Sequence, residues 1–393
     1  MNRTLSSIVI AELFGTSLWF TANGVADRLT LEWGIGNAEL GWLTNAVQLG
    51  FICGTLLFSL SGLADRFPAS RIFFICALCG ALSNLAFAWW SPSLEFALLW
   101  RFFTGLMLAG IYPLGMKLVV SWAPEQMGKA LGWLTGMLCF GTALPHLIRA
   151  LGGGFDWQVM VTLSSLLAVI GGAMVLHTGD GPYAQSSGQF NWGGVLKAFH
   201  QPSFRAAALG YFGHMWELYA LWTVAPLLIA LALSKEALNY GSLTSWLAFV
   251  FIASGGLGCI LGGYWAEKIG SARVAFIALS VSGGLCVIYP GLAHLSLGLL
   301  LALLFIWGVA VAMDSPQFSA LVSHHAPSES VASALSIVNG VGFLITVFSI
   351  QILTWAWDDL RIAAIWLLVP GPLIGLWYMR HLLLNDQIGA RAD

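Results

Sequence analysis

The second half of this sequence repeats the first half, and both halves consist almost entirely of apolar stretches. The repeat is clearest in small, proline and charged residues that return after 202 or 203 positions: Gly105 as Gly308, Pro113 as Pro316, Ala123-Pro124 as Ala326-Pro327, and Asp65-Arg66 as Glu267-Lys268. A chain written this way is constrained to fold as two similar bundles in one bilayer, an internal symmetry found in many transport proteins.

The amino-acid composition indicates that the chain folds in a lipid bilayer rather than in water. Hydrophobic residues make up 58% of the chain and charged residues 9%, and the mean hydropathy is +0.83. Water-soluble globular domains carry about 25% charged residues. These values exclude a soluble globule and predict an integral membrane protein, with the lipid bilayer as its first partner.

The predicted fold class is an all-α membrane protein with twelve transmembrane helices in two six-helix, pseudo-symmetric bundles. A helix of about 20 apolar residues crosses a bilayer core. Stretches of that kind lie near 7–28, 38–63, 72–91, 94–122, 128–151, 158–177, 206–231, 241–264, 272–292, 295–321, 331–354 and 361–383. We therefore expect a first bundle over 1–177, a linker over 178–205 and a second bundle over 206–393.

The linker is polar and rich in Gly and Ser, which is typical of a flexible connection. Within it, Trp192, Val195, Leu196 and Phe199 predict a short helix lying on the inner leaflet.

Lys and Arg positions predict the orientation. If the N-terminus is cytoplasmic, eleven of these residues fall on the inner side and five on the outer side, which favours both termini inside. The inner set is Arg3, Arg66, Arg71, Lys117, Lys129, Lys197, Arg205, Lys268, Arg273, Arg380 and Arg391, and the outer set is Arg28, Arg101, Arg149, Lys235 and Arg361. The first span lacks a small-residue cleavage site and is expected to be its own targeting signal. Short loops and tails suit a monomeric protein of a prokaryotic inner membrane.

Two loops carry a sequence signature. Between spans eight and nine, an acid and a base stand between a glycine four residues upstream of the acid and another three residues downstream. The residues concerned are Gly263, Glu267, Lys268, Gly270 and Arg273, matched in the first copy by Asp65, Arg66 and Arg71. An acid at such a helix end can cap a neighbouring helix, and the bases can meet carbonyl ends or anionic lipid.

This pattern resembles the signature loop of the major facilitator superfamily. The second copy matches fully, whereas the first has Ser61 and Pro68 in place of the glycines. The resemblance covers the whole chain and implies a secondary transporter with its substrate site between two bundles that rock against each other. It does not imply a substrate.

A second element of that family begins at Arg101, which is followed by Gly105 in an R-x-x-x-G pattern. This arginine lies about 10 Å inside the outer end of span four, where a charge is costly unless it faces a cavity or reaches the surface. The resemblance implies a role in proton coupling, and a snorkelling anchor is the alternative. On span five, Gly132, Gly136, Gly141 and Pro145 partly match the antiporter signature, but Leu144 precedes the proline.

The sequence lacks the signature patterns of several classes of transport protein. The sugar-porter pattern after span six, the peptide-transporter pattern on span one and the span-two arginine of nitrate transporters do not occur, nor does the G-x-x-x-x-G-K-[ST] pattern of an ATPase. All six cysteines fall within spans, and the adjacent His324 and His325 fall in a loop, where solvated histidines are expected. We therefore expect no enzyme activity, no cofactor, no metal and no nucleic-acid partner.

Two acids lie deep in predicted spans of the second half. Glu217 lies about 17 Å into span seven, one turn from His214, and a carboxyl there is expected to be protonated or paired. Asp314, beside Pro316 and Gln317, lies about 10 Å from the inner end of span ten. Both are candidate proton carriers. The alternative for Glu217 is a structural carboxyl hydrogen-bonded inside the bundle; Asp314 and Gln317 are expected to face a gate, with an N-cap-like role of Asp314 in a broken helix as the alternative. Glu12 is only about a turn inside span one and is interpreted as an interfacial residue.

Polar and aromatic residues inside spans are candidates for the substrate cavity, with helix packing as the alternative for each. Span five carries a polar stripe at helical spacing that is expected to face the pore. The cavity candidates are Trp19, Phe20, Asn23, Asn45, Gln48, Tyr112, Thr142, His146, Arg149, His214, Trp222, Gln317, Asn339 and Phe343, and the proton-coupling candidates are Glu217, Asp314 and Arg101.

The buried bases lie in the first half and the deep acids in the second. This division predicts that a small organic anion or amphipathic metabolite binds to the first half while the second half handles protons. The alternative is a drug/proton antiporter, which the glycine series of span five favours.

Overall fold

A computed structural model describes residues 3–184, 190–234 and 241–389. Lys235 and Arg391, which entered the orientation count, lie outside these ranges. The side chain of Asp65 is also outside the described part of the structure. The described residues are almost entirely helical, which confirms the predicted all-α class.

The first half forms α1 (Arg3–Thr16), α2 (Thr21–Gly24), α3 (Ala26–Trp33), α4 (Asn37–Ser61), α5 (Leu63–Arg66), α6 (Ala69–Trp89), α7 (Leu94–Leu108), α8 (Tyr112–Trp122), α9 (Met127–Leu151) and α10 (Trp157–Thr178). The linker region contains α11 (Trp192–His200). The second half forms α12 (Pro202–Leu233), α13 (Gly241–Ile269), α14 (Ser271–Ile288), α15 (Leu297–Met313), α16 (Ser315–His325), α17 (Val331–Leu360) and α18 (Pro370–Gly389).

Ten stretches of the described chain are long and apolar enough to cross a membrane. The first expected span is not one of them because it is broken into α1, α2 and α3. The last two run together as one helical stretch over 328–383. The number twelve therefore remains a prediction.

The break in the first span has a local cause. At the end of α1, the Thr16 hydroxyl donates to the Glu12 carbonyl over 2.7 Å, and the Ser17 hydroxyl donates to the Phe14 carbonyl over 2.7 Å. Such side-chain bonds to backbone carbonyls compete with the helical ladder and bend helices. The chain then leaves the helix until Thr21, so the carbonyls of Leu18 and Trp19 become available to other donors.

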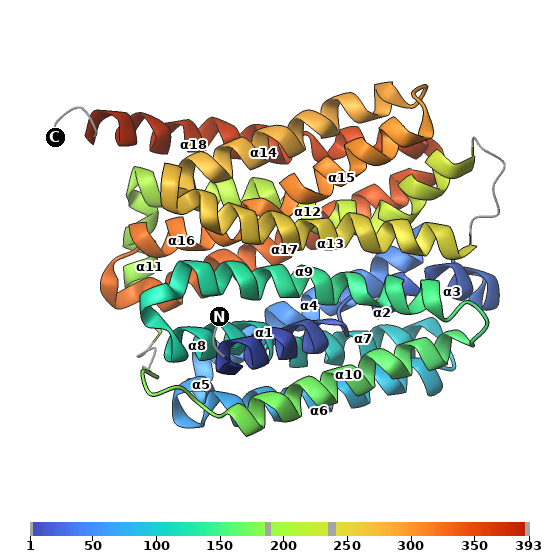
Figure 1. The fold of residues 1–393 in the computed structure, drawn as a ribbon, viewed down its shortest axis with the longest axis horizontal. Coiled ribbons are helices and arrows are strands. Elements are labelled where there is room, and N and C mark those ends of the chain that lie inside the picture. The colour runs from blue at the N-terminus through green and yellow to red at the C-terminus, as the bar shows by residue number, and fades with distance from the viewer. Residues whose placement is uncertain (1–2, 185–189, 235–240, 390–393) are drawn as a thin grey trace.

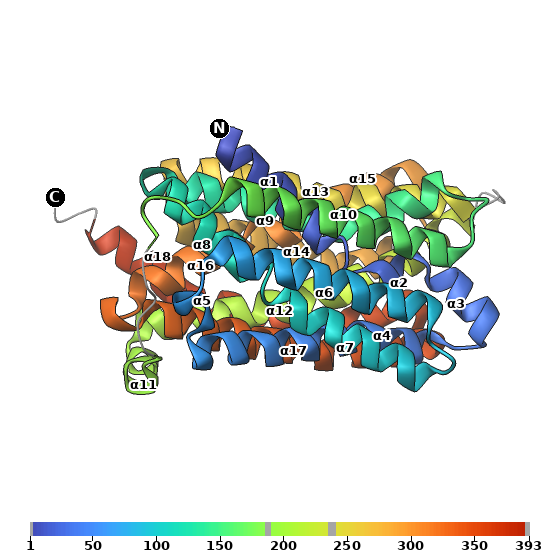
Figure 2. The same cartoon turned by 90° about the horizontal axis from the view of Figure 1, so that it is seen from below.

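The long helices run roughly along the long axis of the molecule, and the two halves of the chain lie on either side of it (Figure 1). They meet along two helix pairs, α9 with α13 and α4 with α17. Seen after a quarter turn, α11 and α5 lie at one end of the molecule and α3 at the other (Figure 2). We call these the α11 end and the α3 end.

The repeated glycines allow helices to approach closely within each half. A side chain on Gly105 of α7 would overlap the Val47 carbonyl of α4, and one on Gly308 of α15 would overlap the Phe251 carbonyl of α13. In a bilayer, helices associate by close packing of small residues because lipid is as apolar as the side chains. The repeat thus preserves the same backbone contact in both bundles.

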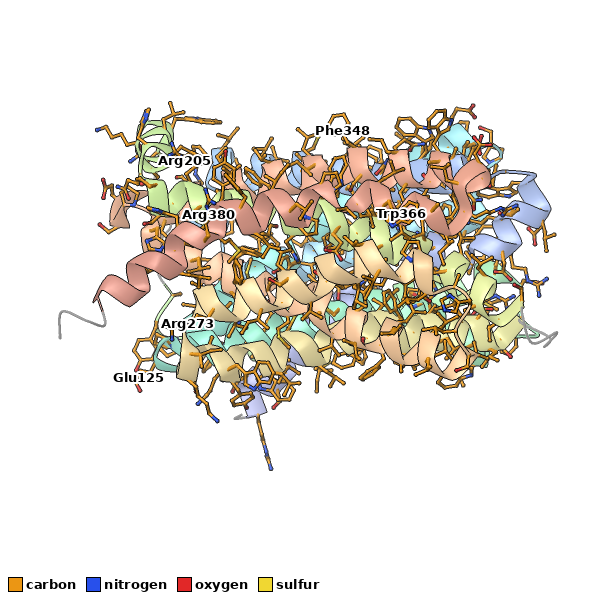
Figure 3. All side chains as sticks on the ribbon, turned by 90° about the horizontal axis from the view of Figure 1, so that it is seen from above. Glu125, Arg205, Arg273, Phe348, Trp366 and Arg380 are labelled. Carbon is orange, nitrogen blue, oxygen red and sulfur yellow. The ribbon has the colours of Figure 1, made fainter. Side chains whose placement is uncertain are left out.

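The surface is that of a membrane-embedded protein. Exposed aromatic side chains such as Phe348 and Trp366 lie along the body of the molecule, whereas Arg205, Arg273 and Arg380 lie near the α11 end (Figure 3). This separation of apolar flanks from a charged end fits a bilayer around the helices.

Gly105→Ala and Gly308→Ala are expected to lower the free energy of unfolding by about 1–3 kcal/mol each, because the added methyl group must push a backbone carbonyl away. Thermal unfolding of the purified protein in detergent measures this. Gly284→Ala is the matched control, since its methyl group would meet no atom. Equal midpoints for all three variants would contradict the packing argument.

Candidate functional site: a cavity between the bundles

A cavity of about 40 Å³ lies where the two halves meet. Residues of both halves line it: Tyr112 of α8; Thr135, Leu138 and Cys139 of α9; Tyr211, His214, Met215, Leu218, Tyr219 and Trp222 of α12; Ser315 and Ser319 of α16; and Asn339 and Phe343 of α17. Five cavity candidates of the sequence are among these residues, namely Tyr112, His214, Trp222, Asn339 and Phe343.

Aromatic rings from both halves pack against one wall of the cavity. The Trp19 ring stacks on those of Tyr219 and Phe343 with centroids 5.8 and 5.7 Å apart. Phe20 meets Trp222 edge to face at 6.3 Å. Offset and edge-to-face pairs are the favoured aromatic geometries. Trp19 and Phe20 do not line the cavity themselves. They pack against three residues of the second half that do line it, Tyr219, Trp222 and Phe343.

His214 lines the cavity, and Asp314 lies directly behind it, outside the lining. His214 Nδ1 lies 2.9 Å from Asp314 Oδ1, and His214 Nε2 lies 2.9 Å from the Ser315 hydroxyl. Both side chains are buried. Asp314 occupies the joint between α15 and α16, where Pro316 stands in the first turn of the new helix. The joint therefore brings an acid next to an imidazole that reaches the cavity.

Glu217 lies elsewhere. Its carboxylate accepts hydrogen bonds from Trp307 Nε1 over 2.8 Å and from the Ser282 hydroxyl over 3.0 Å. Both partners belong to the second half, and Glu217 does not line the cavity. Through these hydrogen bonds, Glu217 connects α12 to α14 and α15.

Arg101 is completely buried, so its side chain does not snorkel. Its guanidinium donates to the Leu18 carbonyl over 3.1 Å, to the Thr21 hydroxyl over 2.7 Å, to Asn84 Oδ1 over 2.9 Å and to the Trp19 carbonyl. These acceptors are neutral, and three of the four belong to the broken first span. Arg101 therefore holds the break in place from α7.

Glu12 is a buried residue, although its sequence position suggested an interfacial one. Its side chain is inaccessible to solvent, and neither carboxylate oxygen has a hydrogen-bond partner. It faces Gly115 of α8, where any side chain would collide with Oε2. Sequence reasoning missed this because the burial arises from helices that pack around α1, namely α8, α9 and α10. The available signal was the glycine one turn beyond Tyr112.

The remaining cavity candidates lie outside the cavity lining. Asn45 donates hydrogen bonds to the second half, to the Val347 carbonyl and to Gln351. Within the first half, Asn23 donates to Thr44, and Gln48 accepts a hydrogen bond from Trp19.

Arg149 forms an ion pair of 2.6 Å with Asp27. The Thr142 hydroxyl and His146 Nε2 are buried without a hydrogen-bond partner, and Gln317 is buried beside Gly262.

The two signature loops differ in backbone conformation. Gly270 has φ 85° and directly precedes α14, while Pro68 has φ −56° at the corresponding place before α6, where the left-handed residue is instead Gly62 with φ 63°. Glu267 pairs with Lys129 of the first half at 3.2 Å. Arg66, Arg71, Lys268 and Arg273 are exposed, and Gly263 faces Gly132 of α9.

Contacts join the halves on both sides of the cavity. At the α3 end, Asn37 donates to Asp358 over 2.7 Å, and at the α11 end the hydroxyls of Ser59 and Ser336 lie 2.9 Å apart. Polar contacts between the halves therefore lie toward both ends of the molecule.

The profile of the Major Facilitator Superfamily matches residues 8–350. The chain belongs to the Major Facilitator Superfamily. This confirms the resemblance of the signature loops, and it agrees with the expectation of a transporter rather than an enzyme.

Curated relatives match parts of the chain. A niacin transporter of Acinetobacter baylyi is 30% identical over 37% of this chain and 33% of its own length. A 4-hydroxybenzoate transporter of Pseudomonas aeruginosa is 31% identical over 37% of this chain and 32% of its own length. The alignments thus span about a third of each of these relatives.

Solved structures share the fold. The proton:xylose symporter XylE superposes with a TM-score of 0.74 at 15% identity, covering 96% of this chain and 95% of the other. The nucleoside transporter NupG superposes with a TM-score of 0.70 at 13% identity, covering 98% and 99%.

Arg101→Lys is expected to lower the free energy of unfolding by about 2 kcal/mol or more, because an ammonium cannot reach the same fan of acceptors and leaves buried carbonyls unpaired. Thermal unfolding in detergent tests this, with Arg361→Lys, an exposed position, as the control. An unchanged midpoint in Arg101→Lys would show that the bonds to the broken span do not stabilise it.

Proposed function

We propose that the protein is a proton-coupled secondary transporter that moves a small aromatic carboxylate across the membrane by alternating access. The observation that carries this proposal is the cavity between the halves, whose wall combines aromatic rings with His214, the histidine that lies 2.9 Å from Asp314. We further propose that both termini lie in the cytoplasm, so that the α11 end is the cytoplasmic end.

The size of the cavity supports alternating access. Sites for small molecules usually have about 300–1,000 Å³, whereas this cavity has about 40 Å³. A substrate can enter only if the halves move apart at one end. The polar contacts at each end, such as Asn37 with Asp358, can break and re-form as the bundles rock.

The lining supports an aromatic acid as substrate. Tyr219, Trp222 and Phe343 offer ring faces and edges, while Asn339 and Ser315 offer hydrogen bonds to a carboxylate or hydroxyl group. Niacin and 4-hydroxybenzoate, which the names of two relatives give as their substrates, are both single rings bearing one carboxylate. We infer the same class for this chain.

The His214–Asp314 pair supports proton coupling. A neutral histidine beside an ionised aspartate carries one negative charge, which repels an incoming carboxylate. One added proton makes the pair neutral, with a positive imidazolium directed at the cavity. In a medium of low dielectric this difference is large, so the carboxylate and the proton favour each other's binding.

Asp314→Asn is expected to abolish accumulation of 4-hydroxybenzoate or nicotinate driven by an imposed proton gradient in proteoliposomes. Without the Asp314 carboxylate, the pair no longer changes from one negative charge to neutral when it takes up a proton. Exchange of labelled for unlabelled substrate without a gradient should persist. Uptake of both labelled acids, with and without the gradient, measures this.

Glu217→Gln is the matched control, since it removes the other deep carboxyl without touching the cavity lining. It should retain gradient-driven accumulation if purified as a monodisperse protein. Accumulation by Asp314→Asn at the wild-type level would contradict the coupling role of the pair. Counterflow of tetraphenylphosphonium but not of either acid would instead support a drug/proton antiporter.

A further inference from the structure

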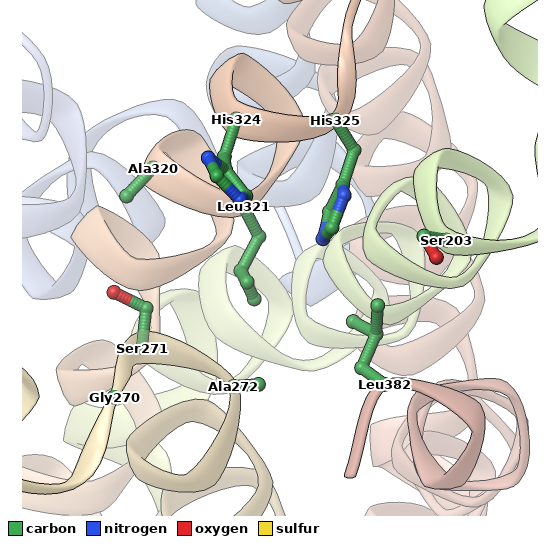
Figure 4. A pocket seen from close by; sticks show the side chains of 9 residues that line it. All are labelled: Ser203, Gly270, Ser271, Ala272, Ala320, Leu321, His324, His325 and Leu382. Carbon is green, nitrogen blue, oxygen red and sulfur yellow. The ribbon is translucent and has the colours of Figure 1, made fainter. Parts of the chain in front are cut away.

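A second and larger cavity lies at the α11 end, within the second half of the chain. Its volume is about 330 Å³. Residues that line it include Ser203 of α12, Ser271 and Ala272 of α14, His324 and His325 of α16, and Leu382 of α18. Both imidazole rings are directed into it from the end of α16, and the first turn of α14 forms the opposite wall (Figure 4).

The repeat shows what occupies the corresponding place in the first half. There, the carboxylate of Asp180 accepts hydrogen bonds of 2.8 Å from the amides of Ala69 and Ser70, the first two residues of α6. These amides begin a helix and have no acceptor inside it. An oxyanion group supplied by the chain thus caps the start of α6.

The second half has the same amides but not the same acid. At a shift of 202 positions, Ala69 and Ser70 become Ser271 and Ala272, while Asp180 becomes Leu382, whose side chain has no polar atom. All three line the cavity. Where the first half places its own carboxylate, the second half therefore presents two amides at the wall of a cavity.

The surrounding charges favour an anion. The first turns of α12 and α14 contain no acidic residue, and each contains an exposed arginine, Arg205 in α12 and Arg273 in α14. At a shift of 203, Ser121 and Trp122 of the first half become His324 and His325. Helix starts and imidazoles both attract oxyanions.

We propose that this cavity is a binding site for a phosphate group, which takes the place that Asp180 occupies in the first half. The amides of Ser271 and Ala272 hold two of its oxygens, and His324 and His325 hold the others. The cavity is larger than a carboxylate needs and opens at the end that we propose to be cytoplasmic. The phosphate group belongs either to a soluble cytosolic compound or to the headgroup of an anionic lipid.

The test is binding of inorganic phosphate to the purified full-length protein, read as a rise in the unfolding midpoint over chloride at equal ionic strength. The wild type should show a saturable rise. His324→Gln, His325→Gln and Ser271→Pro should each weaken binding by about tenfold, because each removes one donor to the anion. Proline is tolerated at the first position of a helix, so Ser271→Pro keeps α14 intact.

Two further variants sharpen the test. Leu382→Asp restores the carboxylate of the first half and should remove the response to phosphate. His200→Gln changes an exposed histidine at the same end that does not line the cavity, and it should respond as the wild type does. Nanodiscs with and without phosphatidylglycerol separate the two sources, because a lipid headgroup in the site would weaken the binding of added phosphate.

Either lipid result supports the site and identifies the source of its ligand. Equal midpoints in phosphate and chloride for the wild type would overturn the proposal. It would also be overturned if His324→Gln, His325→Gln and Ser271→Pro all bound phosphate as tightly as the wild type. None of these readouts depends on transport, so the outcome is separate from that of the proposed function.

Discussion

The structure depends on one constraint, which is that a charge inside an apolar bundle must find its partners within the chain. Arg101 meets it with backbone carbonyls and two polar side chains, and Glu217 meets it with an indole and a hydroxyl. Both groups are thereby fixed inside one half. Asp314 differs from both, because His214 lies 2.9 Å away but neither carboxylate oxygen has a hydrogen-bond partner among the described residues. Because His214 also lines the cavity, we propose that a proton exchanged at this pair changes the charge that a substrate meets.

The same constraint explains why the first span is broken. An unbroken helix would use its own carbonyls in its ladder, and Arg101 would then lack the acceptors that Leu18 and Trp19 provide. The break also carries Trp19 and Phe20, whose rings reach the aromatic residues of the second half. One buried charge thus connects the conformation of the first span to the contact between the halves. Glu12, buried without a partner beside that break, is the exception within the first half.

Much of the fold could be predicted from the sequence, because hydropathy and internal repetition are local properties. The helical class and the paired halves followed from them, and the family followed from the signature loop between spans eight and nine. The partners in the site could not be predicted in this way. His214 and Asp314 are 100 positions apart, and periodicity on one helix says nothing about contacts to another. The sequence places Arg101 deep in its span. Two of its four acceptors are backbone carbonyls, which every residue carries, so no sequence pattern marks them. Its sequence position predicts an interfacial location for Glu12, because its burial arises from neighbouring helices such as α8, where its carboxylate faces Gly115.

We propose that binding of the substrate and binding of a proton are linked at the His214–Asp314 pair. Calorimetric titration of the purified protein with 4-hydroxybenzoate, in two buffers of different ionisation enthalpy, measures the protons taken up on binding. We expect uptake of up to about one proton per substrate in the wild type and in Glu217→Gln, and none in Asp314→Asn. Equal proton uptake in Asp314→Asn and the wild type would contradict it.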